Sequence, residues 1–146
     1  MELNLIIVLK FVSLVSVGIV AGATVYSSFV EIPIRTKTSE EEQLKNWKLV
    51  FPRASNLLKK YGIVTMFSIL TTWYLTANYY WFLGVIPLFI LIPFTKIFIV
   101  KVNNKIMSLP DSKGVAEIIE NWDKLHFVRT ALAIISFILC VLAVII

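Results

Sequence analysis

The last part of the chain, from Phe127 to Ile146, is an apolar run that contains a single charged residue, Arg129. A run of about 18 or more apolar residues is typical of a helix that crosses a membrane. Three similar runs precede it, at about residues 3–31, 57–77 and 81–102. Hydrophobic residues make up 58% of the sequence, which is more than the interior of a soluble domain of this length can bury. We therefore expect an integral membrane protein whose surface contacts membrane lipid.

The connections between the runs are short, and this predicts how the helices pack. Residues 78–80 and 110–112 are long enough for turns between helices that are adjacent and antiparallel. We expect an all-α membrane protein, an antiparallel four-transmembrane-helix bundle in which residues 1–146 form a single domain. Its fourth helix should begin as an amphipathic segment near Lys113 and enter the membrane near Phe127.

The first run has two interpretations. Its apolar residues up to Val20, followed by the small residues 21–23, are also typical of a secretory signal peptide. Apolar sequence continues as far as Val30, beyond the length of such a signal, so we interpret the run as a retained first span. Pro33 is expected to end or bend its helix.

The polar segment between the first two runs predicts a short helix at the membrane surface. Ser39 followed by Glu42 fits a capping box, with further acidic residues in the first turn. Trp47 and Phe51 would lie on the apolar side of this helix, with Trp47 at the depth of the lipid headgroups. We expect Pro52 to close or kink it.

The placement of basic residues predicts the orientation in the membrane. The first and third loops contain eleven Lys and Arg residues, whereas the second loop and the C-terminus contain none. By the positive-inside rule the first and third loops are cytosolic and both termini are lumenal or external, in the endoplasmic reticulum or another endomembrane. The net charge of +5 is explained by these loops, so it indicates topology, and we expect no nucleic-acid partner.

Few residues in the chain could hold a cofactor. The sequence has one histidine, His126, and one cysteine, Cys140, which lies inside the last run. These residues and the scattered acids do not form the ligand set of a metal or haem site. The sequence also lacks a glycine-rich phosphate loop, a dinucleotide fingerprint and a nucleophilic triad pattern. We therefore expect no metal and no bound cofactor.

The residues that stand out for function lie where the last run begins. Residues three and four apart on a helix share a face, so Trp122, His126, Arg129 and Thr130 line one side of the fourth helix. A charge just inside a membrane is costly, so it usually faces the interior of a bundle and marks function or ion pairing. We expect this face of the helix to be the candidate site.

Counting along the chain brings further polar residues to this face. The third and fourth helices form a hairpin, so residues at equal distances from its turn lie at equal depth. The first helix reaches the same membrane boundary at its end. The cluster expected just inside the cytosolic interface consists of Glu31, Thr95, Lys96, Trp122, His126 and Arg129, with Asn103 and Asn104 on its aqueous side. Because a buried arginine needs a partner, we expect Arg129 to contact Glu31 or a carbonyl freed by Pro93.

Two motifs carry a resemblance to a known family. Residues 92–95 (Ile-Pro-Phe-Thr) and 102–106 (Val-Asn-Asn-Lys-Ile) resemble the third helix of the anthrone oxygenase-like family of small four-span membrane proteins. Residues 122–130, with a Trp, a polar residue and Arg-Thr, resemble the signature of its fourth helix. Residues 18–22 and 31–33 are similar to its first helix.

The resemblance implies a four-span fold and, less directly, a reaction. Fungal members are linked to the oxidation of polyketide anthrones to anthraquinones by molecular oxygen, and most members have no assigned activity. Carried to this chain, the resemblance implies a monooxygenase in which His126 and Arg129 are catalytic. The candidate substrate-binding residues are Asn103, Asn104, Thr95, Trp122 and Phe94.

Two functions remain open at this stage. In the first, His126 acts as general base on a lipophilic polycyclic aromatic substrate, Arg129 stabilises the oxyanion, and Trp122 and Phe94 flank the rings. In the second, the protein is a non-catalytic membrane subunit or a lipid-binding protein, and the cluster holds the helices together, with Glu31 and Arg129 as a structural pair. An open, aromatic-walled cavity of about 300 Å³ or more would favour the first. Either protein could form a homo-oligomer or belong to a larger membrane complex.

Overall fold

The helices follow the apolar runs of the sequence. The computed structural model describes residues 2–146, with side chains from Asn4 onward, and this part of the chain contains helices and turns but no strand. In chain order the elements are α1 (Glu2–Tyr26), the π-helical turn η1 (Ser27–Glu31), α2 (Ile32–Arg35), α3 (Glu40–Thr76), α4 (Tyr79–Phe94), the π-helical turn η2 (Thr95–Ile99), α5 (Val100–Ser108) and α6 (Val115–Ile145).

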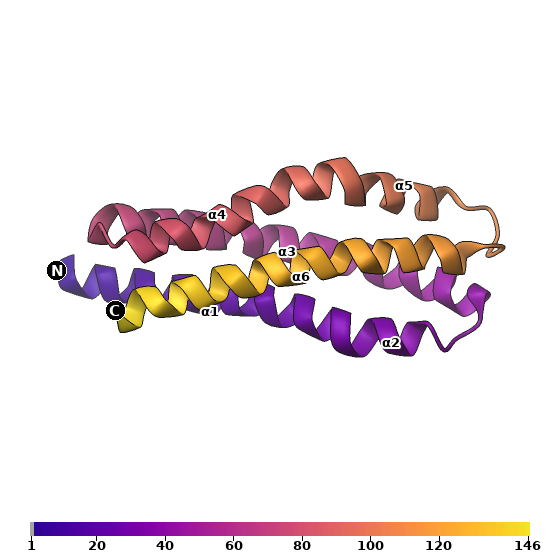
Figure 1. Ribbon diagram of the computed structural model, residues 1–146, viewed down its shortest axis with the longest axis horizontal. Coiled ribbons are helices and arrows are strands. Elements are labelled where there is room, and N and C mark those ends of the chain that lie inside the picture. The colour runs from indigo at the N-terminus through magenta and orange to yellow at the C-terminus, as the bar shows by residue number, and fades with distance from the viewer. Residues whose placement is uncertain (1) are drawn as a thin grey trace.

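Figure 1 shows these elements as helical columns that lie side by side along the long axis, with both termini at the same end. The first column is α1, η1 and α2, the second is α3, the third is α4, η2 and α5, and the fourth is α6. Contacts join α1 to α3, α3 to α4, α4 to α6 and α6 to α1. Each column therefore packs against two others, α3 also contacts α6, and successive columns run in opposite directions.

Three helical stretches are long and apolar enough to cross a membrane. They are Asn4–Arg35, Tyr79–Ser108 and Val115–Ile145. The expectation of an all-α integral membrane protein is therefore confirmed. Helix α3 is not one of the three, because none of its 18-residue stretches is sufficiently apolar.

The segment before α3 forms the expected capping box but not a separate helix. Ser39 Oγ accepts a hydrogen bond of 3.3 Å from the Glu42 backbone N–H, and the Glu42 carboxylate accepts one of 3.2 Å from the Ser39 N–H. The helix that starts there does not close at Pro52; it continues to Thr76. A proline removes one backbone hydrogen bond, and the stacking of Trp47 on Phe51 supports the helix in the turn before it.

The first column also continues past its proline. We expected Pro33 to end or bend the helix, but α2 extends the column to Arg35, with Pro33 in its first turn, where a missing N–H costs little. The turn η1 precedes this proline, and η2 follows Pro93 in the third column. Each π-turn thus marks the point where a proline adjoins a regular helix.

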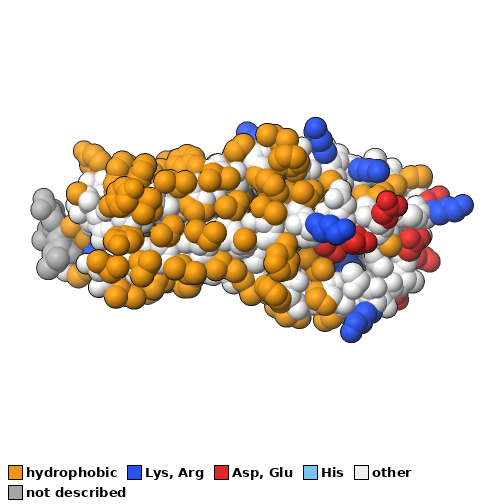
Figure 2. All heavy atoms as spheres, in the orientation of Figure 1, with side chains coloured by type: hydrophobic (Ala, Val, Ile, Leu, Met, Phe, Trp, Pro, Cys, Tyr) orange, Lys and Arg blue, Asp and Glu red, His pale blue; other side chains and the backbone are white. Residues whose placement is uncertain are grey.

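The described interior contains three hydrophobic clusters; the smallest is Val20, Ala21 and Ala133, and the two larger ones differ in character. One contains Val17, Ile69, Trp81, Val85, Leu88, Cys140 and Ala143, and we name the end of the molecule around it the apolar half. The other contains Leu44, Trp47, Ile99, Ile106, Val115, Ile119 and Trp122, and we name that end the charged half. Figure 2 shows hydrophobic side chains covering most of the surface from the terminal end, whereas Lys, Arg, Asp and Glu gather at the opposite end.

Candidate functional site

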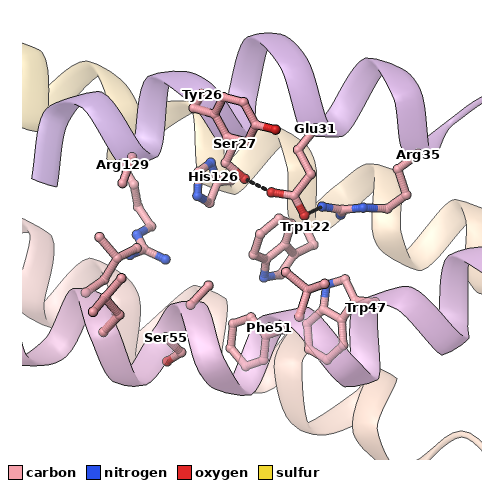
Figure 3. Close-up of a pocket in the computed structure, with 15 residues that line it drawn as sticks. Tyr26, Ser27, Glu31, Arg35, Trp47, Phe51, Ser55, Trp122, His126 and Arg129 are labelled. Carbon is pink, nitrogen blue, oxygen red and sulfur yellow. Dashed lines mark hydrogen bonds and ion pairs between the residues drawn. The ribbon is translucent and has the colours of Figure 1, made fainter. Parts of the chain in front are cut away.

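A cavity of about 320 Å³ lies between the first column, the first half of α3, and α6. Aromatic side chains form much of its wall: Tyr26, Trp47, Phe51 and Trp122. Glu31, Arg35, His126 and Arg129 supply its charged and titratable groups. Figure 3 shows these side chains converging from both sides of the cavity. The cavity therefore combines a hydrophobic lining with a few polar groups, which is typical of small-molecule sites.

The aromatic wall is built from two helices. Trp47 and Phe51 are one turn apart on α3 and stack with ring centroids 4.3 Å apart. The ring of Trp122, from α6, meets each of them edge-on at 6.1 Å. Trp122 Nε1 donates a hydrogen bond of 2.7 Å to Asn103 Oδ1, which fixes the indole in the plane that faces the cavity. The wall is thus a rigid surface on which a flat molecule can stack.

The two acidic groups beside the cavity, Glu31 and Asp123, are both paired with Arg35. Its guanidinium lies 2.9 Å from Glu31 and 3.3 Å from Asp123, and 5.5 Å from the centre of the Trp122 ring. Glu31 also accepts a hydrogen bond of 2.9 Å from Ser27 Oγ. The expected Glu31–Arg129 pair is therefore wrong. Because the first helix continues past Pro33, it brings Arg35 one turn beyond Glu31, at the spacing where helical side chains meet.

Arg129 has no such partner. Among the residues that the structure describes, it forms neither a salt bridge nor a hydrogen bond, so the expected contact with a carbonyl near Pro93 is also absent. Its Nε is buried without a hydrogen-bond partner. In Figure 3 the side chain extends across the cavity toward the helix that carries Ser55. Its positive charge is thus directed at the cavity instead of being neutralised by a neighbouring acid.

His126 is almost completely buried, with 3% of its surface exposed. Its ring lies on that of Trp122 at a centroid distance of 4.9 Å, and its Nδ1 is 3.2 Å from Ser28 Oγ. The hydrogen-bond partner of the ring is therefore a hydroxyl from η1. Nε2 has no hydrogen-bond partner within the described residues, so it is the ring nitrogen left for a molecule in the cavity.

Four of the residues expected at the site line the cavity: Glu31, Trp122, His126 and Arg129. Asn103 is connected to it through its bond to Trp122. The other expected residues, Phe94, Thr95, Lys96 and Asn104, are not in its lining. Phe94 packs against the cluster of the charged half, Thr95 Oγ1 is buried without a partner, and Lys96 and Asn104 are exposed. The cavity opens on the side of α6 that faces α1 and α3, away from the hairpin partner that carries these residues.

Sequence reasoning missed five residues of the site: Tyr26, Ser28, Arg35, Trp47 and Phe51. Two signals were available, because Arg35 follows Glu31 by four positions and Phe51 follows Trp47 by four. No pattern in the sequence distinguishes Ser28 from the other hydroxyl residues of the first run. Its place depends on η1, and a π-turn has no simple sequence signature.

No group of three or more His, Cys, Asp or Glu side chains comes together as metal ligands would within the described part of the chain.

Comparison with known proteins gives one match. Residues 47–139, which are more than half of the chain, match the family model described as anthrone oxygenase. The matched segment contains the cavity wall of α3 and the His126–Arg129 face of α6, and it excludes α1 and η1. No curated protein and no solved structure matches the chain.

Proposed function

We propose, for a chain that belongs to the anthrone oxygenase family, that this integral membrane protein oxidises a flat, lipophilic, anthrone-like molecule with molecular oxygen. The observation that carries the proposal is the aromatic-walled cavity of about 320 Å³ reached by both His126 and Arg129. Such a volume lies within the range of about 300–1,000 Å³ found for small-molecule pockets. Within the described residues His126 Nε2 forms no hydrogen bond and Arg129 forms no salt bridge, so these two groups supply the cavity with a base and a cation.

The reaction begins with a proton transfer. The methylene group between the two aromatic rings of an anthrone is acidic, because the anion spreads onto the carbonyl oxygen. His126 Nε2 takes this proton, a role that accelerates reactions by about 10²–10⁴-fold. Arg129 stabilises the negative oxygen that forms, and a fixed charge is most effective in a water-poor setting such as this cavity.

Oxygen then reacts with the carbanion. A C–O bond forms, the resulting hydroperoxide loses its second C–H proton, and the O–O bond breaks as water leaves. The methylene becomes a carbonyl, so one oxygen atom enters the product and the other becomes water. Carbon loses four electrons and O₂ gains four, which balances the step without a further reductant. During this sequence Trp47, Phe51 and Trp122 hold the ring system by stacking.

The edge of the cavity supports a lipophilic substrate. Tyr26, Val50 and Leu57 line it and are themselves exposed on the outer surface of the helices. In a membrane this surface faces lipid, so a lipophilic molecule can reach the cavity from the bilayer without crossing water.

The proposal includes a four-span topology with the first and third loops in the cytosol. Helices α1 and α4 run in the same direction along the molecule and both belong to apolar stretches. If both cross the membrane, α3 must return the chain between them. Its last twenty or so residues, which carry only Lys59 and Lys60 as charges and are less apolar than the other three stretches, would do so. The whole helix is about 55 Å long at 1.5 Å per residue.

The second function, a non-catalytic membrane subunit or lipid-binding protein, is favoured by a different observation. Arg35 holds both Glu31 and Asp123 and stacks on Trp122, so it joins the first column to α6 with no ligand present. On this hypothesis the cavity holds a lipid chain, and His126 contributes packing alone.

Oxygen uptake by the protein in lipid nanodiscs separates the two functions. With an anthrone as substrate, the rate above that of empty nanodiscs should fall by about 10²–10⁴-fold in His126→Ala, and strongly in Arg129→Lys, with unchanged melting temperatures. Ser136→Ala is the matched control, since Ser136 lies on the same helix but bonds to the Gly84 carbonyl, away from the cavity. If the wild type gives no uptake above background, or His126→Ala retains it, the oxygenase proposal is wrong.

A further inference from the structure

A chain of buried hydroxyl groups extends from the back of the His126 ring. Its Nδ1 lies 3.2 Å from Ser28 Oγ, and Ser28 Oγ lies 2.7 Å from Thr130 Oγ1. Thr130 Oγ1 in turn lies 3.2 Å from two backbone carbonyls, those of Thr24 and His126. Ser28 is 5% exposed and Thr130 is 1% exposed, so no bulk water competes for these contacts.

The carbonyl end of this chain sets its direction. A carbonyl oxygen can only accept, so Thr130 donates its single hydrogen to Thr24 O, His126 O or both. The short contact between the hydroxyls then requires Ser28 to donate to Thr130. With its own hydrogen used, Ser28 can only accept from His126, so Nδ1 must carry the proton. The opposite direction would leave both carbonyl contacts without a hydrogen, at one hydrogen bond fewer.

We propose that Ser28 and Thr130 are positioning residues that hold His126 in the tautomer with a proton on Nδ1 and a free electron pair on Nε2. This inference deepens the proposed function, on which its catalytic consequence rests, because only that tautomer lets Nε2 accept a substrate proton. The ring nitrogen that faces away from a reaction commonly receives a carbonyl or carboxylate partner, which can only accept. Here the partner is the Ser28 hydroxyl, which could also donate to the ring. Because Ser28 donates its hydrogen to Thr130, it can only accept from Nδ1.

The π-turn explains why Ser28 reaches the ring. Ser28 is the second residue of η1 and is the buried residue of that turn. A π-turn encloses one more residue than an α-turn, and such turns are frequent at functional sites because they redirect side chains. The same turn lies beside the Thr24 carbonyl, which ends the hydroxyl chain. The first column therefore supplies both the acceptor for His126 and the fixed end that orients it.

Nuclear magnetic resonance tests the tautomer directly, because the chain contains one histidine. Protein labelled with ¹⁵N-histidine in nanodiscs gives one pair of ring nitrogen signals, and their chemical shifts distinguish a protonated from an unprotonated nitrogen. The wild type, with the ring neutral, should show a protonated Nδ1 and an unprotonated Nε2. A wild-type spectrum with the proton on Nε2 would overturn the proposal without any variant.

Two variants test whether Thr130 determines the tautomer of His126. Thr130→Val removes the hydroxyl while keeping the shape, and it should shift the ratio of the two tautomers by about fivefold or more, the equilibrium weight of one hydrogen bond. Thr130→Ser should restore the wild-type signals, and Ser136→Ala, which removes a buried hydroxyl elsewhere on α6, should leave them unchanged. Unchanged signals in Thr130→Val would show that Thr130 does not set the tautomer.

Activity gives an independent readout. With an anthrone substrate, Thr130→Val should lower kcat and leave KM unchanged, since the cavity lining is intact. A wild type with the expected tautomer but no oxygen uptake would refute the proposed function alone. Oxygen uptake that is normal in Thr130→Val despite a shifted tautomer would refute the positioning role alone.

Discussion

The two halves of the molecule are held together by different means. In the apolar half several small hydroxyl side chains bond to backbone carbonyls or to each other, and Asn78 bonds to the Ala143 carbonyl. Thr72 donates a hydrogen bond of 2.7 Å to the Ser68 carbonyl, and its hydroxyl lies 3.0 Å from that of Ser13 on the neighbouring helix. Ser136 donates a hydrogen bond of 2.6 Å to the Gly84 carbonyl. These contacts are typical of helices that approach each other closely in lipid.

The charged half uses large groups instead. A buried arginine joins two carboxylates and lies over the Trp122 ring, which in turn meets the rings of Trp47 and Phe51. Large side chains keep the helices further apart, and the space between them is the cavity. If the proposed function is correct, the chemistry lies at the end where large and charged side chains surround a cavity, and the apolar half acts as the scaffold.

The largest expected effect concerns the side of the membrane on which each half of the molecule lies. If the charged half lies at the cytosolic side, an epitope tag after Ile146 should be fully protected from protease in sealed microsomes, and a tag between Leu109 and Gly114 should be fully digested. The reason is the positive-inside rule applied to the basic loops. Digestion of the C-terminal tag without detergent would reverse the orientation, and digestion of only one terminus would remove one of the four spans.

Loss of Arg35 should be the most destabilising single change in the charged half. Arg35→Ala leaves Glu31 and Asp123 without their common partner, and removing one member of a buried ion pair costs about 3–5 kcal/mol. The melting temperature in detergent measures the effect. Lys124→Ala is the control, because the Lys124–Glu120 pair is exposed and should contribute nothing measurable. Equal melting temperatures for the two variants would show that the Arg35 cluster does not hold this half together.

A smaller effect is expected from overfilling the apolar half. In Gly84→Ala the new methyl would lie 2.7 Å from Cys140 Sγ, and such overpacking costs about 1–3 kcal/mol. Gly22→Ala is the matched control, because nothing lies within 4 Å of its methyl position. The double variant Gly84→Ala/Cys140→Ala should recover part of the loss. If Gly84→Ala melts like Gly22→Ala, the close approach of α4 and α6 is not a constraint on the fold.

The sequence predicted the fold through its apolar runs and short turns, and it predicted the family through residues 92–106 and 122–130. Four of the expected site residues line the cavity: three share a face of α6 through helical spacing, and Glu31 ends the first apolar run. It could not predict which side of α6 the cavity occupies. Phe94, Thr95 and Asn104 lie on the hairpin partner of α6, whereas the cavity faces the other two columns.

Prolines account for the remaining errors. Pro33 was expected to end or bend its helix, and Pro52 to close or kink its own; both lie inside continuous helical columns, so neither ends a helix. A proline disrupts the backbone locally, but packing on both sides of it decides whether the helix stops. Because the first helix continues past Pro33, Arg35 pairs with Glu31. Arg129 then has no salt bridge within the described residues.

The π-turn η1 has a consequence for how this chain could change in length. Its i to i+5 hydrogen bonds enclose one residue more than an α-turn does over nearly the same rise, so the flanking helices keep their positions around the extra residue. Deleting one exposed residue of the turn, such as Phe29, would leave a regular α-helix with both flanks in place and would move Ser28 off the ring of His126. A deletion of one codon would therefore remove the Ser28–His126 contact while keeping the helical bundle, and an insertion of one codon in a chain with a regular α-helix here would create the π-turn.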